Sequence, residues 1–251
     1  MQQSSPIDMP RIEINTVMRM VYVWMGLGLL VTMFTAYTVG NTPALLELAV
    51  APGMGIISII FLFGSVIALS AGLNRNWLSP GGAIALFFVF AAIMGFTLSV
   101  TMVAYLSPTI TLADGTTLVN DFYNPQPVYA AAASAAGLFL AMTVVGFTTK
   151  ADLTKMGTYL MIGLIGIIIA MVVNIFLRSD GLSFIISILG VIIFTGLTAY
   201  DTQKIRDMSL NPEIARGGNA AVKFSVMGAL TLYLDLINLF LFLLMIFGGR
   251  D

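Results

Sequence analysis

Seven apolar runs, each long enough to cross a lipid bilayer, limit what this chain can fold into. About 20 mostly apolar residues suffice for one membrane-spanning helix. The runs cover about residues 17–39, 53–73, 82–106, 128–148, 157–177, 182–209 and 222–247. Only 9% of the residues are charged, whereas soluble domains carry about 25%. We therefore predict an all-α integral membrane protein, with a short cytoplasmic tail at residues 1–16 and one seven-helix domain over residues 17–251.

The basic residues predict the orientation of these helices. If the N-terminus is cytoplasmic, nine of the 11 basic residues fall on the cytoplasmic side, and only Arg178 and Arg250 fall outside. Those nine are Arg11, Arg19, Arg75, Lys150, Lys155, Lys204, Arg206, Arg216 and Lys223. Such an excess is typical of cytoplasmic loops. We expect a multi-pass protein of the inner (cytoplasmic) membrane with its C-terminus outside.

The absence of two residue types excludes several chemistries. The chain contains no cysteine and no histidine, which removes disulfides, thiol nucleophiles, zinc and haem sites and serine–histidine catalysis. The net charge of −1 offers no basic face for nucleic acid. We expect no cofactor and no enzymatic activity. If the protein responds to pH near neutrality, a carboxyl group is the expected sensor, because histidine is missing.

The last apolar run carries one acidic residue, Asp235, near its middle. A charge at the bilayer centre costs about 2.5 kcal/mol or more, so Asp235 should face other helices or water. Gly228, Thr231 and Asn238 recur on the same helical face. Two interpretations remain open: an ion or proton site, or a buried carboxyl hydrogen-bonded to a neighbouring helix.

A second intramembrane acid, Asp201, lies on the preceding run, with Thr198 and Lys204 on the same face. The short connection at about 211–221 makes the last two helices antiparallel neighbours, so the two carboxyl groups can face each other. Desolvation and like charge would then make the pair share one proton and titrate as a unit. Loss of that proton would drive the helices apart, which describes a pH-operated latch.

Further residues are candidates around this pair. If ions cross the protein beside this pair, we expect Thr198, Thr231 and Asn238 to line their pathway. Both aspartates could hold Ca²⁺ weakly and transiently, since Ca²⁺ prefers oxygen ligands. Arg75 is either a gating partner for one aspartate or an ordinary cytoplasmic loop residue.

Small residues predict helix contacts elsewhere, for example Ser134, Gly137 and Ala141 in the fourth run.

Two motifs resemble the Bax inhibitor-1 family, also called the transmembrane Bax inhibitor motif family, in its bacterial form. They are Tyr-Asp-Thr-Gln-Lys-Ile at 200–205 and Leu-Tyr-Leu-Asp-Leu-Ile-Asn-Leu-Phe at 232–240, with a further likeness over 74–95. The resemblance implies six helices around a central C-terminal helix. It also implies a pH-sensitive calcium leak, with Asp201 and Asp235 as the sensing pair and Arg75 as partner.

The sequence departs from that family in the second run, in the last run and in a longer loop between the two aspartate motifs, and rival functions must be weighed. Run 53–73 lacks the acidic residue of some members, and Met245 stands where a basic residue is common. One alternative is a non-conducting regulator of a membrane partner, such as a membrane-bound protease. Another is an intramembrane aspartyl protease, which uses paired carboxyls, but the Gly-x-Gly-Asp and Pro-Ala-Leu motifs of those enzymes are missing.

Overall fold

The computed structural model describes residues 11–74 and 78–249. Seven of its helices are long and apolar enough to span a membrane, which confirms the predicted all-α membrane fold. They are α1 (Arg11–Gly40), α3 (Met54–Asn74), α4 (Pro80–Leu106), α5 (Gln126–Thr148), α6 (Thr154–Leu177), α7 (Asp180–Met208) and α9 (Gly218–Gly248). Helix α1 begins at Arg11. Residues 11–16 are therefore helical, whereas the sequence predicted a short tail over residues 1–16.

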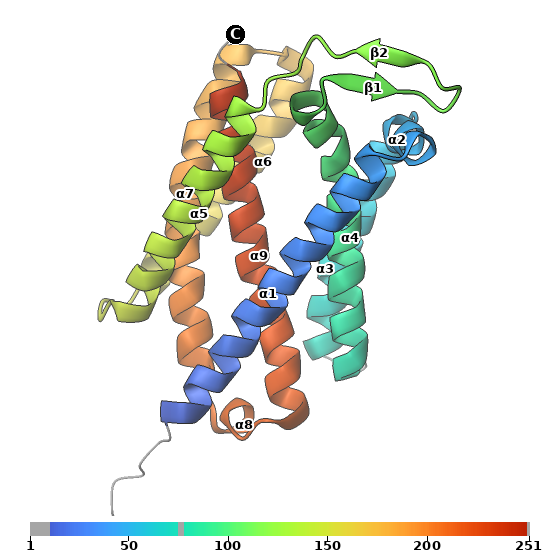
Figure 1. The fold of residues 1–251 in the computed structure, drawn as a ribbon. Coiled ribbons are helices and arrows are strands. Elements are labelled where there is room, and N and C mark those ends of the chain that lie inside the picture. The colour runs from blue at the N-terminus through green and yellow to red at the C-terminus, as the bar shows by residue number, and fades with distance from the viewer. Residues whose placement is uncertain (1–10, 75–77, 250–251) are drawn as a thin grey trace, which may run out of the picture.

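Short elements join these helices at the two ends of the bundle (Figure 1). One end carries α2 (Pro43–Val50) and an antiparallel hairpin of β1 (Thr109–Thr111) and β2 (Thr117–Val119). We call it the hairpin end. The other carries the single-turn helix α8 (Pro212–Ala215), and we call it the α8 end. The apolar runs did not predict these elements.

Polar side chains determine where several helices begin and end. The Ser79 hydroxyl accepts a hydrogen bond from Gly82 N at the start of α4, directly before Pro80. Ser179 does the same for α7. The Asn174 side chain accepts from Ser179 N at 3.1 Å and donates to the Ser183 hydroxyl at 2.7 Å. These bonds fix the tight turn between α6 and α7.

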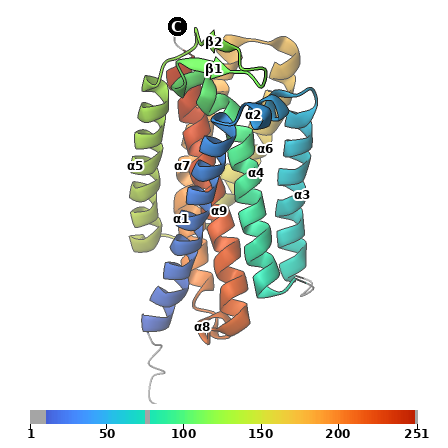
Figure 2. The ribbon, with the colours of Figure 1, turned by 45° about the vertical axis from the view of Figure 1, so that its right-hand side comes forward.

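Helix α9 lies at the centre of the bundle, as expected (Figures 1 and 2). Half of its most apolar stretch is buried, against 6% for α6. It packs mainly against α7, α5 and α1, and less against α4. Helices α3 and α6 pack on α4 and α7 and lie further out. The six outer helices therefore do not surround α9 evenly, and α6 leaves one flank of α9 partly uncovered.

Candidate functional site

Asp201 lies on α7 in a groove between α6 and α9, which we call the α6–α9 groove. The groove has a volume of about 890 Å³ and occupies the half of the bundle nearer the α8 end. Its lining includes Met161 and Ile162 of α6, Tyr200, Asp201 and Lys204 of α7, and Thr231 of α9. The Lys204 ammonium lies 5.6 Å from the centre of the Tyr200 ring and is close enough to attract the Asp201 carboxylate. Asp201 itself is half-buried.

Asp235 lies on α9, behind the groove wall. Only 4% of its surface is exposed, and its Oδ2 has no hydrogen-bond partner among the described residues. A Cβ on Gly228 would lie 3.2 Å from Ile205, which fixes the antiparallel register of α7 and α9. Asp235 is therefore about one helical turn further from the α8 end than Asp201. The two carboxyl groups are close enough to interact electrostatically.

The three expected pathway residues occupy different environments. Thr231 lines the α6–α9 groove, Thr198 is fully buried and Asn238 is half-buried. Each donates its side-chain hydrogen bond to a carbonyl four residues earlier on its own helix. Of the three, only Thr231 lies on the surface of the groove, where an ion could reach its hydroxyl oxygen. The structure thus brings Asp201 and Thr231 to one surface and leaves Asp235 and Thr198 behind it.

The proposed gating residue Arg75 lies outside the described residues. Within the described ranges, the aspartate pair is not joined by a third acidic, histidine or cysteine side chain at one metal-binding point. Ca²⁺ takes about six to eight oxygen ligands. The carboxyl and hydroxyl oxygens here are of the kind that Ca²⁺ prefers.

Sequence reasoning missed a polar contact made by Tyr233, two residues before Asp235 on α9. The Tyr233 hydroxyl and the Thr32 hydroxyl of α1 are 2.6 Å apart, and Thr32 also contacts the carbonyls of Gly28 and Ala91. Phe87 and Phe90 meet the Tyr233 ring edge to face, with centroids 6.0 and 5.7 Å away. The sequence did offer a signal for this contact, because a tyrosine in the middle of an apolar span needs a partner for its hydroxyl.

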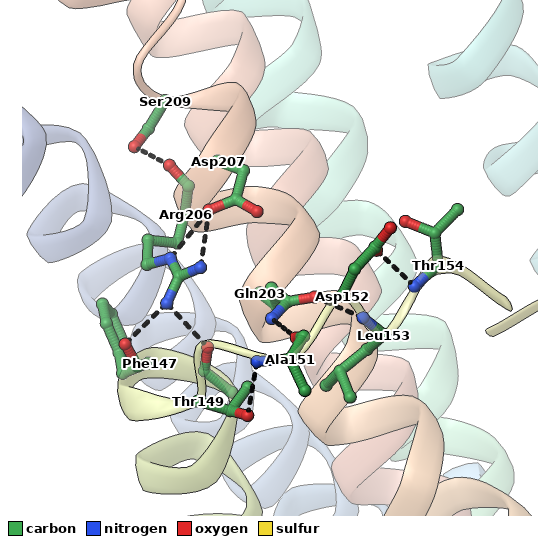
Figure 3. A network of polar contacts seen from close by, with 11 residues as sticks. Phe147, Thr149, Ala151, Asp152, Leu153, Thr154, Gln203, Arg206, Asp207 and Ser209 are labelled. Carbon is green, nitrogen blue, oxygen red and sulfur yellow. Dashed lines mark hydrogen bonds and ion pairs between the residues drawn. The ribbon is translucent and has the colours of Figure 1, made fainter. Parts of the chain in front are cut away.

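A second missed network joins α7 to the connection between α5 and α6 (Figure 3). The Gln203 amide donates to Ala151 O at 2.8 Å and accepts from Leu153 N at 2.9 Å. Arg206 donates to Phe147 O at 2.6 Å and pairs with Asp207. The motif that holds Asp201 therefore has two faces: one carries the acid, and the other fixes the neighbouring loop.

The connection between α5 and α6 also contains an exposed acidic residue, Asp152. Hydrogen bonds from the side chain and backbone of Thr154 lower the pKa of its carboxyl group. Asp152 therefore stays ionised at neutral pH, next to the start of α6.

Comparison with known proteins gives matches along nearly the whole chain. The family described as "Inhibitor of apoptosis-promoting Bax1" matches residues 14–251. The inner membrane protein YbhL of Escherichia coli K12 is 40% identical over 249 residues, covering 99% of this chain and 97% of YbhL. An uncharacterised protein of Borreliella burgdorferi is 40% identical over 237 residues, covering 94% and 93%. One from Deinococcus radiodurans is 37% identical over 252 residues, covering 100% and 96%. With its seven helices and both aspartate motifs inside the matched region, this chain belongs to the Bax inhibitor-1 family.

Proposed function

We propose that this protein is a pH-sensitive leak for cations, Ca²⁺ above all, gated by Asp201 and Asp235. One observation carries the proposal. Two acidic side chains lie on adjacent membrane-spanning helices, close enough to interact, and a groove from the α8 end reaches one of them. Intramembrane acids are rare and usually belong to ion or proton pathways. The protein acts as a conduit in this proposal, needs no cofactor and is not an enzyme.

The burial of Asp235 suggests how the latch works. A buried carboxylate oxygen without a partner is very unfavourable, unless the group holds or shares a proton. With one proton between them, the two aspartates hold α7 and α9 together. When that proton leaves, two like charges repel across a low-dielectric gap, and the helices separate. Flux should therefore rise as pH rises through the titration of the pair, and fall as the pair is protonated.

The uneven packing around α9 supports the same route. Helix α6 packs on α7, so the α6–α9 groove stays open between α6 and α9. In this proposal ions enter the groove at the α8 end and reach Asp201 and Thr231. A site with few oxygen ligands binds an ion weakly, and weak binding suits a permeation route because the ion must also leave. In this proposal the buried Asp235 closes the route beyond this point.

Calcium efflux from liposomes containing the purified protein tests the proposal. We expect the unaltered protein to release Ca²⁺ faster as pH rises, and Asp201→Asn and Asp235→Asn to lose that dependence, because neither variant can share a proton between two acids. Asp180→Asn is the matched control. It makes the same change on α7, at an exposed position near the hairpin end, and should behave as the unaltered protein. An unchanged pH profile in both site variants would refute the mechanism.

The same assay addresses the alternative function. A non-conducting regulator of a partner, such as a membrane-bound protease, would show no Ca²⁺ release from liposomes that contain this protein alone. Folded, monodisperse protein without flux at any pH would therefore favour the regulator over the leak.

A further inference from the structure

A second groove, on the opposite side of α9, has no role in the proposed route. It has a volume of about 650 Å³ and is lined by α1, α4, α5 and α9. We call it the α1–α5 groove. Helices α1 and α5 touch near the α8 end, where the Tyr22 and Phe147 rings lie 6.3 Å apart. They diverge toward the hairpin end (Figures 1 and 2), and the groove lies between them in that half of the bundle.

The lining of this groove is almost entirely hydrocarbon. Small side chains of α1 and α5 hollow it, among them Ala36, Ala132 and Ala136, and Met33 and Met102 border it. No charged residue is among those that line it. At roughly 30 Å³ per molecule the groove would hold about 20 waters, but apolar cavities stay dry. Inside a membrane, the remaining material of matching chemistry is an acyl chain.

The dimensions of the groove also match one lipid chain. On α1 its lining runs from Leu29 to Asn41, which is roughly 18 Å at 1.5 Å per residue. One leaflet contributes about 15 Å of hydrocarbon, half of a core about 30 Å thick. Asn41 and Ser107 place polar groups at the hairpin end of the groove, and Ile237 lies at its deep end.

We infer that the α1–α5 groove binds one acyl chain of a phospholipid from the leaflet at the hairpin end. A phospholipid fits better than a free fatty acid, because the described residues that line the groove include no cationic side chain to hold a carboxylate. The chain end would lie against Leu236 and Ile237, directly after Asp235. The binding of lipid in this groove does not depend on the proposed function.

Lipid retained by the purified protein tests the site without reference to flux. After detergent exchange, native mass spectrometry should find one phospholipid per unaltered chain, and a several-fold lower occupancy in Ala132→Trp, whose indole fills the groove. Ala133→Trp is the matched control, because Ala133 is an exposed neighbour on the same helix that does not line the groove. It should retain the lipid. Thermal unfolding of both variants checks that they fold.

A cross-linking measurement covers the case in which Ala132→Trp fails to fold. A phosphatidylcholine carrying a diazirine in its acyl chain should label Met33 and Met102 in the unaltered protein more strongly than the exposed Ile169 and Phe176 of α6. Equal labelling of all four would overturn the inference. So would equal retention in the two tryptophan variants, no retained phospholipid in the unaltered protein, or a retained fatty acid instead. Retention without Ca²⁺ flux would leave this site standing and refute only the leak.

Discussion

At the scale of single residues, the buried polar groups divide into satisfied and unsatisfied ones. Tyr233 and Thr32 satisfy each other, and Thr198 bonds to its own helix. The Asp235 carboxyl, two residues after Tyr233, has an oxygen with no partner in the part of the chain that the structure describes. Native proteins keep few such atoms, and those that persist often have a function. Four other side chains in the described ranges share this feature, namely Tyr22, Trp24, Thr143 and Thr202, but of the five only Asp235 is acidic.

The Tyr233 hydroxyl should contribute measurably to stability. Tyr233→Phe removes the 2.6 Å contact with Thr32 and keeps the ring between Phe87 and Phe90. Hydrogen bonds in membrane proteins contribute about 0.6 kcal/mol on average, so we expect a loss of about that size in the free energy of unfolding, measured by denaturant titration in detergent. Tyr159→Phe, at a 75% exposed position, should change nothing. An equal effect of the two substitutions would contradict this assignment.

At the scale of helices, close packing depends on a few glycines that touch backbone. A Cβ on Gly95 of α4 would meet the Thr32 carbonyl of α1, and one on Gly146 of α5 would lie 2.5 Å from the Ala199 carbonyl of α7. Backbone cannot move aside as a flexible side chain can. These two positions therefore fix how closely α4 approaches α1 and how closely α5 approaches α7.

Gly95→Ala should destabilise the protein by about 1–3 kcal/mol, because overpacking displaces helices. Gly137→Ala is the matched change at a helical glycine with nothing within 4 Å. It should be neutral or stabilise by up to about 1 kcal/mol, since alanine favours helix. Denaturant titration of the two variants side by side measures the difference. A Gly95→Ala variant as stable as Gly137→Ala would show that this contact is not tight.

Gln203 should hold the connection between α5 and α6 in place. Gln203→Ala removes both of its bonds to that connection. We expect faster hydrogen exchange at Leu153 N and faster proteolysis near residues 149–153. Lys204→Ala, the next residue on α7, makes no such bond and is the control. Equal protection in both variants would mean that Arg206 suffices to hold the loop.

The sequence predicted the helices well and their contacts less well. Apolar runs located all seven spans, because a membrane requires each backbone group to be bonded within its own helix. The small-residue rule was wrong for α5: Gly137 faces open space and Ala141 is exposed, while Ala131 and Ala135 make the buried contacts. Composition shows that a helix has a small face, but not whether a helix or a lipid meets it. The hairpin is tied to α2 by the hydrogen bond from Ala113 N to the Glu47 carboxyl, a contact between distant parts of the sequence that hydropathy does not report.

At the scale of the whole molecule, two grooves of different chemistry approach α9 from opposite ends. The α6–α9 groove contains Asp201, Lys204 and Lys223, whereas the lining of the α1–α5 groove is uncharged. Tyr233 and Asp235 of α9 lie between the two. The two ends of the bundle therefore differ in chemistry, and the proposed function depends on which end faces the cytoplasm.

The distribution of basic residues predicts that direction. Of those in the described ranges, Arg178 lies at the hairpin end, and the others lie in the half nearer the α8 end. They are Arg11, Arg19, Lys150, Lys155, Lys204, Arg206, Arg216 and Lys223. The bias follows the positive-inside rule, so the α8 end should be cytoplasmic and the hairpin outside.

Because the chain has no cysteine, single introduced cysteines can test this orientation without background. Ala113→Cys lies in the hairpin and Asn219→Cys at the start of α9, and both positions are exposed. A membrane-impermeant maleimide applied to intact cells, with the outer membrane opened where there is one, should label Ala113→Cys only. Both should react once the inner membrane is permeabilised. The reverse pattern would place the α6–α9 groove outside the cell, and Asp201 would then respond to external rather than cytoplasmic pH.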